Sequence, residues 1–159
     1  MPSTDPYRQQ LARFLDWHEA HATLEQSVAD LSPELRGKVP AGLPYSVWQL
    51  LEHVRITQKD ILDFFVNPKY VEPHWPADYW PKRVAPMSEE EWQASIATFQ
   101  RDRDGVKQVA LDPTIDLFAT IPHGSGQTYI REILLVADHT AHHVGQIIVV
   151  RRLLGAWST

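Results

Sequence analysis

The chain has 159 residues, of which 43% are hydrophobic and 22% are charged, a balance typical of one folded domain and unlike a disordered chain. Its formal net charge of -5 disfavours a nucleic-acid partner, because acidic side chains repel phosphates. It has no cysteine, which excludes disulfides, thiolate metal ligands and a cysteine nucleophile. We therefore expect a single domain over residues 1–159 in a reducing, cytoplasmic setting.

The start of the chain does not read as a targeting segment. Asp5, Arg8 and Arg13 interrupt the region where a signal peptide needs an apolar stretch. The most apolar stretch, residues 147–150, is far shorter than the about 20 apolar residues that cross a bilayer. We expect no membrane partner.

The first predicted helix runs from Pro6 to about Leu31. Asp5 is a typical N-cap residue, and proline suits the first helical position. Helical spacing then places His18 and Glu25 together on the inner face. These two residues are either proton carriers or a mutually satisfied buried pair.

A second helix opens at Ser46, which forms a capping-box pattern with Gln49, and runs to about Asn67. Its apolar face includes His53. The connection over residues 68–86 holds five of the 12 prolines and several aromatic residues, too stiff a composition for a flexible linker. We expect an ordered strap there.

Two longer helices complete the predicted fold. Ser88, followed by three glutamates, opens a third helix that ends before Asp112. Thr128 opens a fourth, which reaches Leu154 and ends before Gly155. The fourth helix is apolar almost all round, so most of it should be buried. The sequence thus predicts an all-α fold, an antiparallel-like bundle of four helices. The three long connections leave the helix directions undecided.

Three histidines of this bundle could share a metal ion. His139 and His143 lie four residues apart and project to one face, and His53 lies on another helix that can face them. Neutral imidazoles suit zinc first, with nickel or iron also possible, and three protein ligands leave a fourth position open. Spacing alone leaves the alternative that these are buried histidines bonded to carbonyls or acids.

The sequence resembles the DinB/YfiT-like superfamily, whose last helix carries the pattern HxxxHxGQ before an arginine and a Leu-Gly ending. That pattern is matched here by His139, His143, Gly145 and Gln146. Residues 46–62 are similar to the family's earlier segment, in which the single ligating histidine corresponds to His53. The resemblance implies a metal-binding four-helix bundle and covers most of the chain, but it leaves the reaction open.

The resemblance also distinguishes neighbouring histidines. It places His143 on the family's second ligand and His142 on a position often occupied by an aromatic residue. The two side chains project about 100° apart around the helix, so both cannot easily reach one ion. His74 and His123 fall in connections and are read as surface residues that could close over the site.

Polar residues near the ligands supply the remaining candidates. Each ligating imidazole needs a partner for its other ring nitrogen, and the candidates are Glu132, Asp60, Gln146 and Gln49. The candidate catalytic residues are Glu132, Glu25 and His18, which could carry protons or line the pocket.

The open metal position suggests a thiol-dependent S-transferase acting on a small molecule. A chain without cysteine must take a low-molecular-weight thiol from solution. The resemblance implies the same, since some superfamily members are S-transferases or isomerases that use bacillithiol, mycothiol or glutathione. The alternatives are a hydrolase using metal-bound hydroxide, and a non-catalytic metal- or ligand-binding stress protein.

Self-association is a further expectation. The first predicted helix carries a second apolar stripe that four helices alone would not bury. This stripe consists of Trp17, Leu24, Val28 and Leu31. Relatives are frequently dimers, so the resemblance also implies a homodimer.

Overall fold

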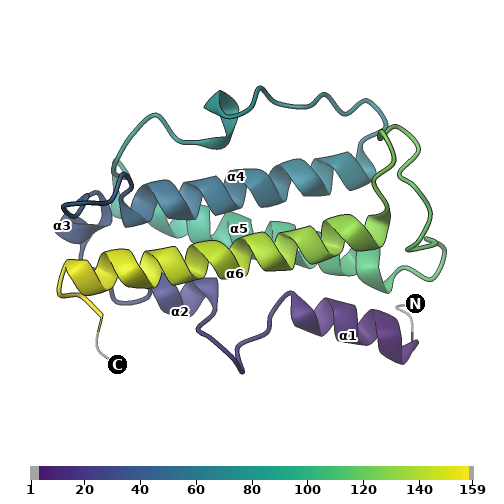
Figure 1. Cartoon of the computed structure of the whole chain (residues 1–159), viewed down its shortest axis with the longest axis horizontal. Coiled ribbons are helices and arrows are strands. Elements are labelled where there is room, and N and C mark those ends of the chain that lie inside the picture. Colours follow the sequence, from purple (N-terminus) through teal and green to yellow (C-terminus); the bar gives the residue numbers. More distant parts are fainter. Residues whose placement is uncertain (1–3, 158–159) are drawn as a thin grey trace.

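The chain forms a bundle in which three long helices lie side by side and two short ones fill the fourth position (Figure 1). The computed structural model describes residues 4–157, which contain no β-strand. The elements are α1 (Pro6–Phe14), α2 (Leu24–Val28), α3 (Pro33–Arg36), α4 (Val47–Val66), the 3-10 turn η1 (Ala77–Tyr79), α5 (Glu89–Leu111) and α6 (Tyr129–Leu153). The predicted all-α bundle is confirmed.

The predicted first helix is wrong in one respect, because it is broken. Helix α1 ends at Phe14, and a new helix, α2, begins after its N-cap residue Thr23. Thr23 and Gln26 form a capping box, each side chain bonding the other residue's backbone N–H. This arrangement satisfies amides that a helix start leaves unpaired and so favours a new helix over a continuous one.

The long helices begin where their caps predict. Ser46, Ser88 and Thr128 each accept a hydrogen bond from a backbone N–H in the first turn of α4, α5 and α6. At the far end of α6, Gly155 has φ 68°, a conformation that glycine adopts without strain.

Helices α4 and α5 run parallel, a direction that the long connection between them left undecided in the sequence. Glu52 bonds Ser95 near their starts, and Gln58 donates to the Phe99 carbonyl further along, so the two helices advance together. The strap of residues 67–88 therefore returns along the length of α4 before α5 begins (Figure 1). Helix α6 runs the opposite way, since Phe65 near the end of α4 stacks on Tyr129.

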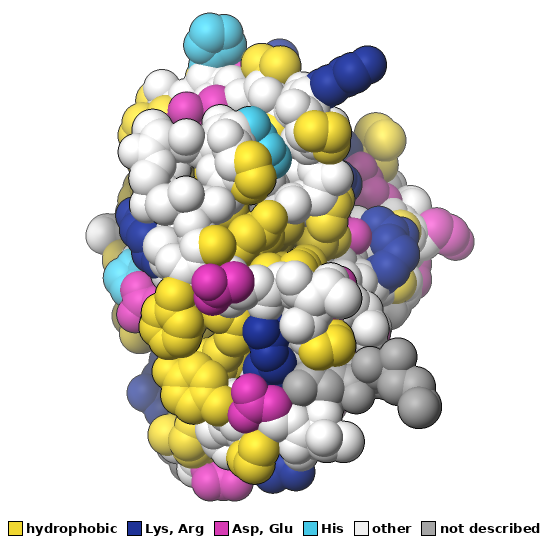
Figure 2. Space-filling view, turned by 90° about the vertical axis from the view of Figure 1, so that its right-hand side faces the viewer, with side chains coloured by type: hydrophobic (Ala, Val, Ile, Leu, Met, Phe, Trp, Pro, Cys, Tyr) yellow, Lys and Arg dark blue, Asp and Glu magenta, His cyan; other side chains and the backbone are white. Residues whose placement is uncertain are grey.

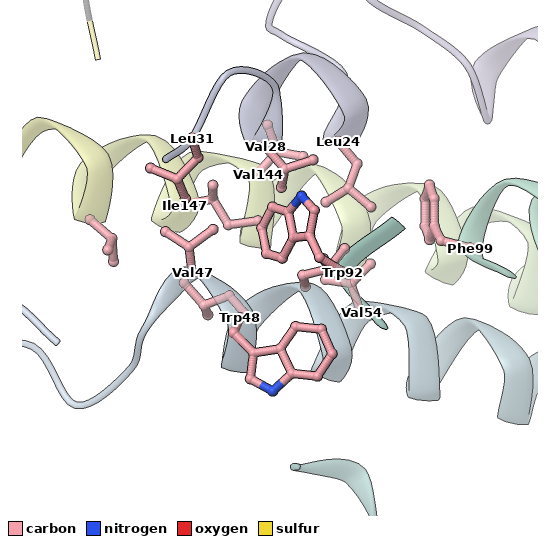
Figure 3. Packing of buried hydrophobic residues seen from close by; sticks show 13 residues of the cluster. Leu24, Val28, Leu31, Val47, Trp48, Val54, Trp92, Phe99, Val144 and Ile147 are labelled. Carbon is pink, nitrogen blue, oxygen red and sulfur yellow. The ribbon is translucent and has the colours of Figure 1, made fainter. Parts of the chain in front are cut away.

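Two apolar clusters hold the helices together. In the first cluster, Trp92 lies between α4 and the labelled residues of α2 and α6 (Figure 3), and its ring centroid is 6.3 Å from that of Trp48. The second cluster lies toward the other end and joins α1 to α4, α5 and α6. Each fully buried aliphatic or aromatic side chain contributes about 1.5–3 kcal/mol, so these clusters fix the helix positions on which the site depends.

Helix α6 is less buried than its composition predicts. Its outer face exposes Leu134 (42%), Leu135 (37%) and Val149 (45%). Within residues 4–157 it alone has the length and apolar character of a membrane span, which is weak support for one because a buried core helix shares both properties. Here α6 packs against α2 and α4.

The apolar stripe expected to drive self-association is also buried within the chain. Leu24, Val28 and Leu31 are buried, and Trp17 alone stays exposed (40%), so this stripe does not support a dimer.

Figure 2, which views the end of the bundle where α4 ends and α6 begins, shows acidic and basic side chains scattered among hydrophobic ones.

The capping box gives a direct test of the helix break. We expect Thr23→Ala to lower the free energy of unfolding by about 1 kcal/mol, because it leaves an amide of α2 unpaired. Urea denaturation would measure this, with Thr23→Ser as the control that keeps the hydroxyl. Equal losses in both variants would contradict a capping role.

Candidate metal centre

Three imidazoles converge between α4 and α6. The antiparallel packing of these helices brings His53 beside His139 and His143, which lie one turn apart. The Nε2 atom of His139 lies 3.1 Å from the Nε2 atom of His53 and 3.1 Å from that of His143. The structure thus brings together the three histidines that the sequence analysis named, and one ligand atom from each lies within 4.8 Å of the others.

The protons of these rings cannot satisfy both short contacts. The Nδ1 atom of His53 donates to the Tyr79 carbonyl at 2.7 Å, and that of His143 donates to Oε1 of Gln146 at 2.7 Å. In neutral rings these bonds leave both Nε2 atoms with bare lone pairs. His139 can give a proton to one of them, so the other contact sets two lone pairs 3.1 Å apart. A cation at the centre would satisfy all three.

The spacing also fits a metal ion. With zinc–nitrogen bonds of about 2.0–2.1 Å, tetrahedral ligand atoms lie about 3.3 Å apart. The two measured separations of 3.1 Å are close to that edge length. Imidazole nitrogens suit zinc, nickel or iron far better than calcium or magnesium, so the donor set and the geometry agree.

The environment keeps these histidines neutral, as ligation requires. Burial, followed by the neighbouring His143 and His53, lowers the pKa of His139 to about 3. Burial also lowers the pKa of His143 to about 4, against the opposing effect of the hydrogen bond that His143 donates to Gln146. The pKa of His53 falls for the same reason, although its bond to the Tyr79 carbonyl counteracts burial. At neutral pH no proton competes strongly for the cluster.

The strap positions the ring of His53 through its backbone. Asp60 of α4 accepts hydrogen bonds from the hydroxyls of Tyr70 and Tyr79, at 2.7 and 2.8 Å. Burial and then these bonds raise the pKa of both hydroxyls, so both stay protonated donors. The Tyr79 carbonyl then accepts the Nδ1 proton of His53. Asp60, expected to partner an imidazole itself, therefore acts through the strap.

An aromatic stack covers the same ring. Trp80 lies parallel to His53, with ring centroids 3.9 Å apart and an interplanar angle of 2°. Tyr45 stacks on the other side of Trp80 at 4.3 Å. The predicted ordered strap is thus present. It holds the imidazole of His53 through the hydrogen bond to the Tyr79 carbonyl and through the stacked ring of Trp80.

The histidines open on one side into a cavity of about 700 Å3. Its lining comprises the three histidines with Tyr45, Trp75, Pro76, Trp80, His142 and Gln146. None of these described residues is acidic or basic apart from histidine, so the cavity offers aromatic surface and one amide but no carboxylate.

Of the two roles expected for His18 and Glu25, the buried pair is wrong and the catalytic role stays a prediction. His18 lies in the exposed segment between α1 and α2, because the helix is broken there. Glu25 instead forms an ion pair with Arg103 at 2.6 Å. Burial alone would raise the pKa of Glu25, but the bond from Arg103 lowers it and keeps the carboxylate charged. Neither residue lines the histidine cavity.

The other candidates divide between the site and the scaffold. Gln146 bonds His143, as expected. Gln49 caps α4, and Glu132 is buried beside Arg131, its ion-pair partner, without lining the cavity. A catalytic role for Glu132 stays a prediction.

Of the other histidines, His142 lies beside the cluster, with its ring centroid 4.9 Å from that of His143, whereas His123 and His74 lie apart from it. Nε2 of His142 contacts the amide nitrogen of Gln146 at 3.2 Å, at the cavity wall. His123 bonds the carbonyl of Phe64, and His74 is exposed on the strap. The sequence analysis missed the stacking of Tyr45 and the carbonyl of Tyr79; no side-chain pattern encodes the latter.

A bundle of helices with a three-histidine cluster open to a cavity defines a class of candidate metalloproteins. The sequence profile of the DinB superfamily matches residues 16–147, which include all of α4 and the part of α6 that carries His139 and His143. The chain belongs to the DinB superfamily. Searches of curated proteins and of solved structures find no match.

Acid should destabilise the metal-free protein through this cluster. From about pH 6.5 down to about pH 4, the unfolded chain takes up protons that the folded histidines do not, so the free energy of unfolding falls as pH falls. The free energy of unfolding should fall between about pH 7 and pH 5 in both proteins. We expect this fall to be smaller in His139→Asn than in the wild type, by on the order of 1 kcal/mol.

Urea denaturation in the presence of chelator at each pH would measure this difference. His142→Asn is the matched control, since His142 is exposed on the same helix. Identical pH slopes for wild type and His139→Asn would contradict a neutral cluster.

Proposed function

We propose that the protein is a metal-dependent, thiol-using transferase whose metal ligands are His53, His139 and His143. The observation that carries the proposal is the convergence of three Nε2 atoms at the wall of a cavity. Three ligands from the chain leave one coordination position for a reactant. Zinc is the metal we expect, with nickel or iron as the alternatives.

A bound divalent ion would lower the pKa of a thiol or water placed next to it and would hold that reactant beside the cavity. The lining favours a thiol over water as the nucleophile. A thiol ionises near pH 8.5 unaided, whereas zinc peptidases that activate water use a glutamate as general base. No carboxylate of residues 4–157 lines this cavity, and the chain has no cysteine, so the thiol must come from solution.

The protein's own residues would orient the reactants and exclude water. Tyr45 and the edge of Trp80 form an aromatic wall that an electrophile can contact, because both faces of Trp80 are already covered. The side-chain oxygen of Gln146 accepts a hydrogen bond from His143, and its side-chain nitrogen lies 3.2 Å from Nε2 of His142. In the transfer, the thiol sulfur forms a bond to the electrophilic carbon, the leaving group departs with its bonding electrons, and the thiol proton passes to solvent.

Metal analysis of histidine variants tests the ligand set. Protein purified without added metal or chelator should carry about one zinc per chain, and His53→Ala, His139→Ala and His143→Ala should each lower this to near zero, because two imidazoles bind too weakly. His142→Ala, one residue from a ligand, should keep the metal. Unchanged stoichiometry in the first three variants would contradict the assignment.

Activity assays separate the reaction classes. The zinc-loaded protein should consume a model electrophile such as 1-chloro-2,4-dinitrobenzene only when a low-molecular-weight thiol is present, with the rate falling at least about 100-fold in His139→Ala. Cleavage of nitrophenyl esters without thiol would instead favour a hydrolase. If the metal-loaded protein shows neither activity, the result would favour a binding protein.

A further inference from the structure

A second, apolar groove continues from the histidine cavity. It lies at the end of the bundle where α4 begins and α6 ends (Figure 1), and its volume is about 390 Å3. The two spaces share Tyr45, His142 and Gln146 as lining residues, so they are adjacent. The rest of the groove is lined by Leu43, Pro44, Leu50, Gly145, Val149 and Val150.

The groove carries no formal charge. Its lining contains no Asp, Glu, Lys or Arg among the described residues, and its polar groups are those it shares with the cavity. Burying a charged group there would leave that charge without a partner, which is costly, whereas an alkyl or aryl group would gain by leaving water.

Gly145 keeps the groove open. It lies on α6 between the cavity residues His142 and Gln146 and the apolar Val149. A Cβ atom placed on Gly145 would meet no atom within 4 Å, so the packing of the helix does not require glycine. A larger side chain here would occupy groove space without displacing the protein.

We propose that this groove binds an uncharged alkyl or aryl substituent of the substrate whose reactive group lies at the three histidines. The inference rests on the proposed metal centre. The occupant is the electrophile and not the thiol, because low-molecular-weight thiols of the glutathione kind carry polar and charged groups that this lining cannot pair. The substrate class is therefore a neutral electrophile with an apolar tail.

Hydroxamates of increasing length test the groove without requiring turnover. Acetohydroxamate, butanohydroxamate and octanohydroxamate have the same metal-binding head and differ only in their alkyl chain. We expect calorimetric dissociation constants on the zinc-loaded full chain to fall by about three- to fourfold for each methylene that enters the groove.

Gly145→Leu should remove this dependence on chain length while leaving acetohydroxamate binding and zinc content unchanged. Gly145→Ala is the matched control, because alanine also favours the helix but fills little of the groove. This variant should keep most of the dependence on chain length. Circular dichroism and metal content would verify that both variants fold.

The outcomes separate this inference from the proposed function. If acetohydroxamate binds the wild type and octanohydroxamate binds no more tightly, the groove proposal is overturned while the metal centre stands. Chain-length dependence that survives in Gly145→Leu overturns it as well. A protein that takes up none of zinc, nickel and iron, or that does not bind acetohydroxamate when loaded, overturns the proposed function and this inference together.

Discussion

The candidate site depends on three imidazole nitrogens held closer together than their own protons can satisfy. Two of the rings give their Nδ1 protons to Tyr79 and Gln146, so their Nε2 lone pairs face His139. Such an arrangement is unfavourable in a protein interior unless a cation joins it or the surrounding structure enforces it. The apolar clusters enforce it here, because they fix α4 against α6 independently of the histidines.

The parallel course of α4 and α5 explains why His53 has a backbone partner. A helix of 20 residues is about 30 Å long, and a chain that must start α5 at the same end as α4 has to travel back over that length. The returning strap passes over α4, where Asp60 anchors it through two tyrosine hydroxyls. A short hairpin between antiparallel helices would have left the Nδ1 atom of His53 without the Tyr79 carbonyl.

Local signals in the sequence sufficed for the long helices, and spacing together with the family resemblance indicated the three-histidine cluster, but neither sufficed for the connections. Ser46, Ser88 and Thr128 cap their helices through side chains, which the sequence displays directly. Thr23 and Gln26 display the same capping pattern, yet continuous apolar spacing across them predicted one helix. Once that helix breaks, positions before and after it lose their common face, and His18 can no longer meet Glu25.

The charges near the site are paired away from it, which shapes what the cavity can do. Glu52 is bonded to Arg55 and Ser95, Asp60 to two tyrosines, and Glu132 to Arg131. None of these carboxylates lines the cavity, so an ion held by three neutral imidazoles would keep its full positive charge there. Carboxylate or thiolate ligands from the chain would have reduced that charge. A neutral ligand set therefore favours an anionic fourth ligand such as a thiolate, and an uncharged groove beside it favours a neutral partner for that thiolate to attack.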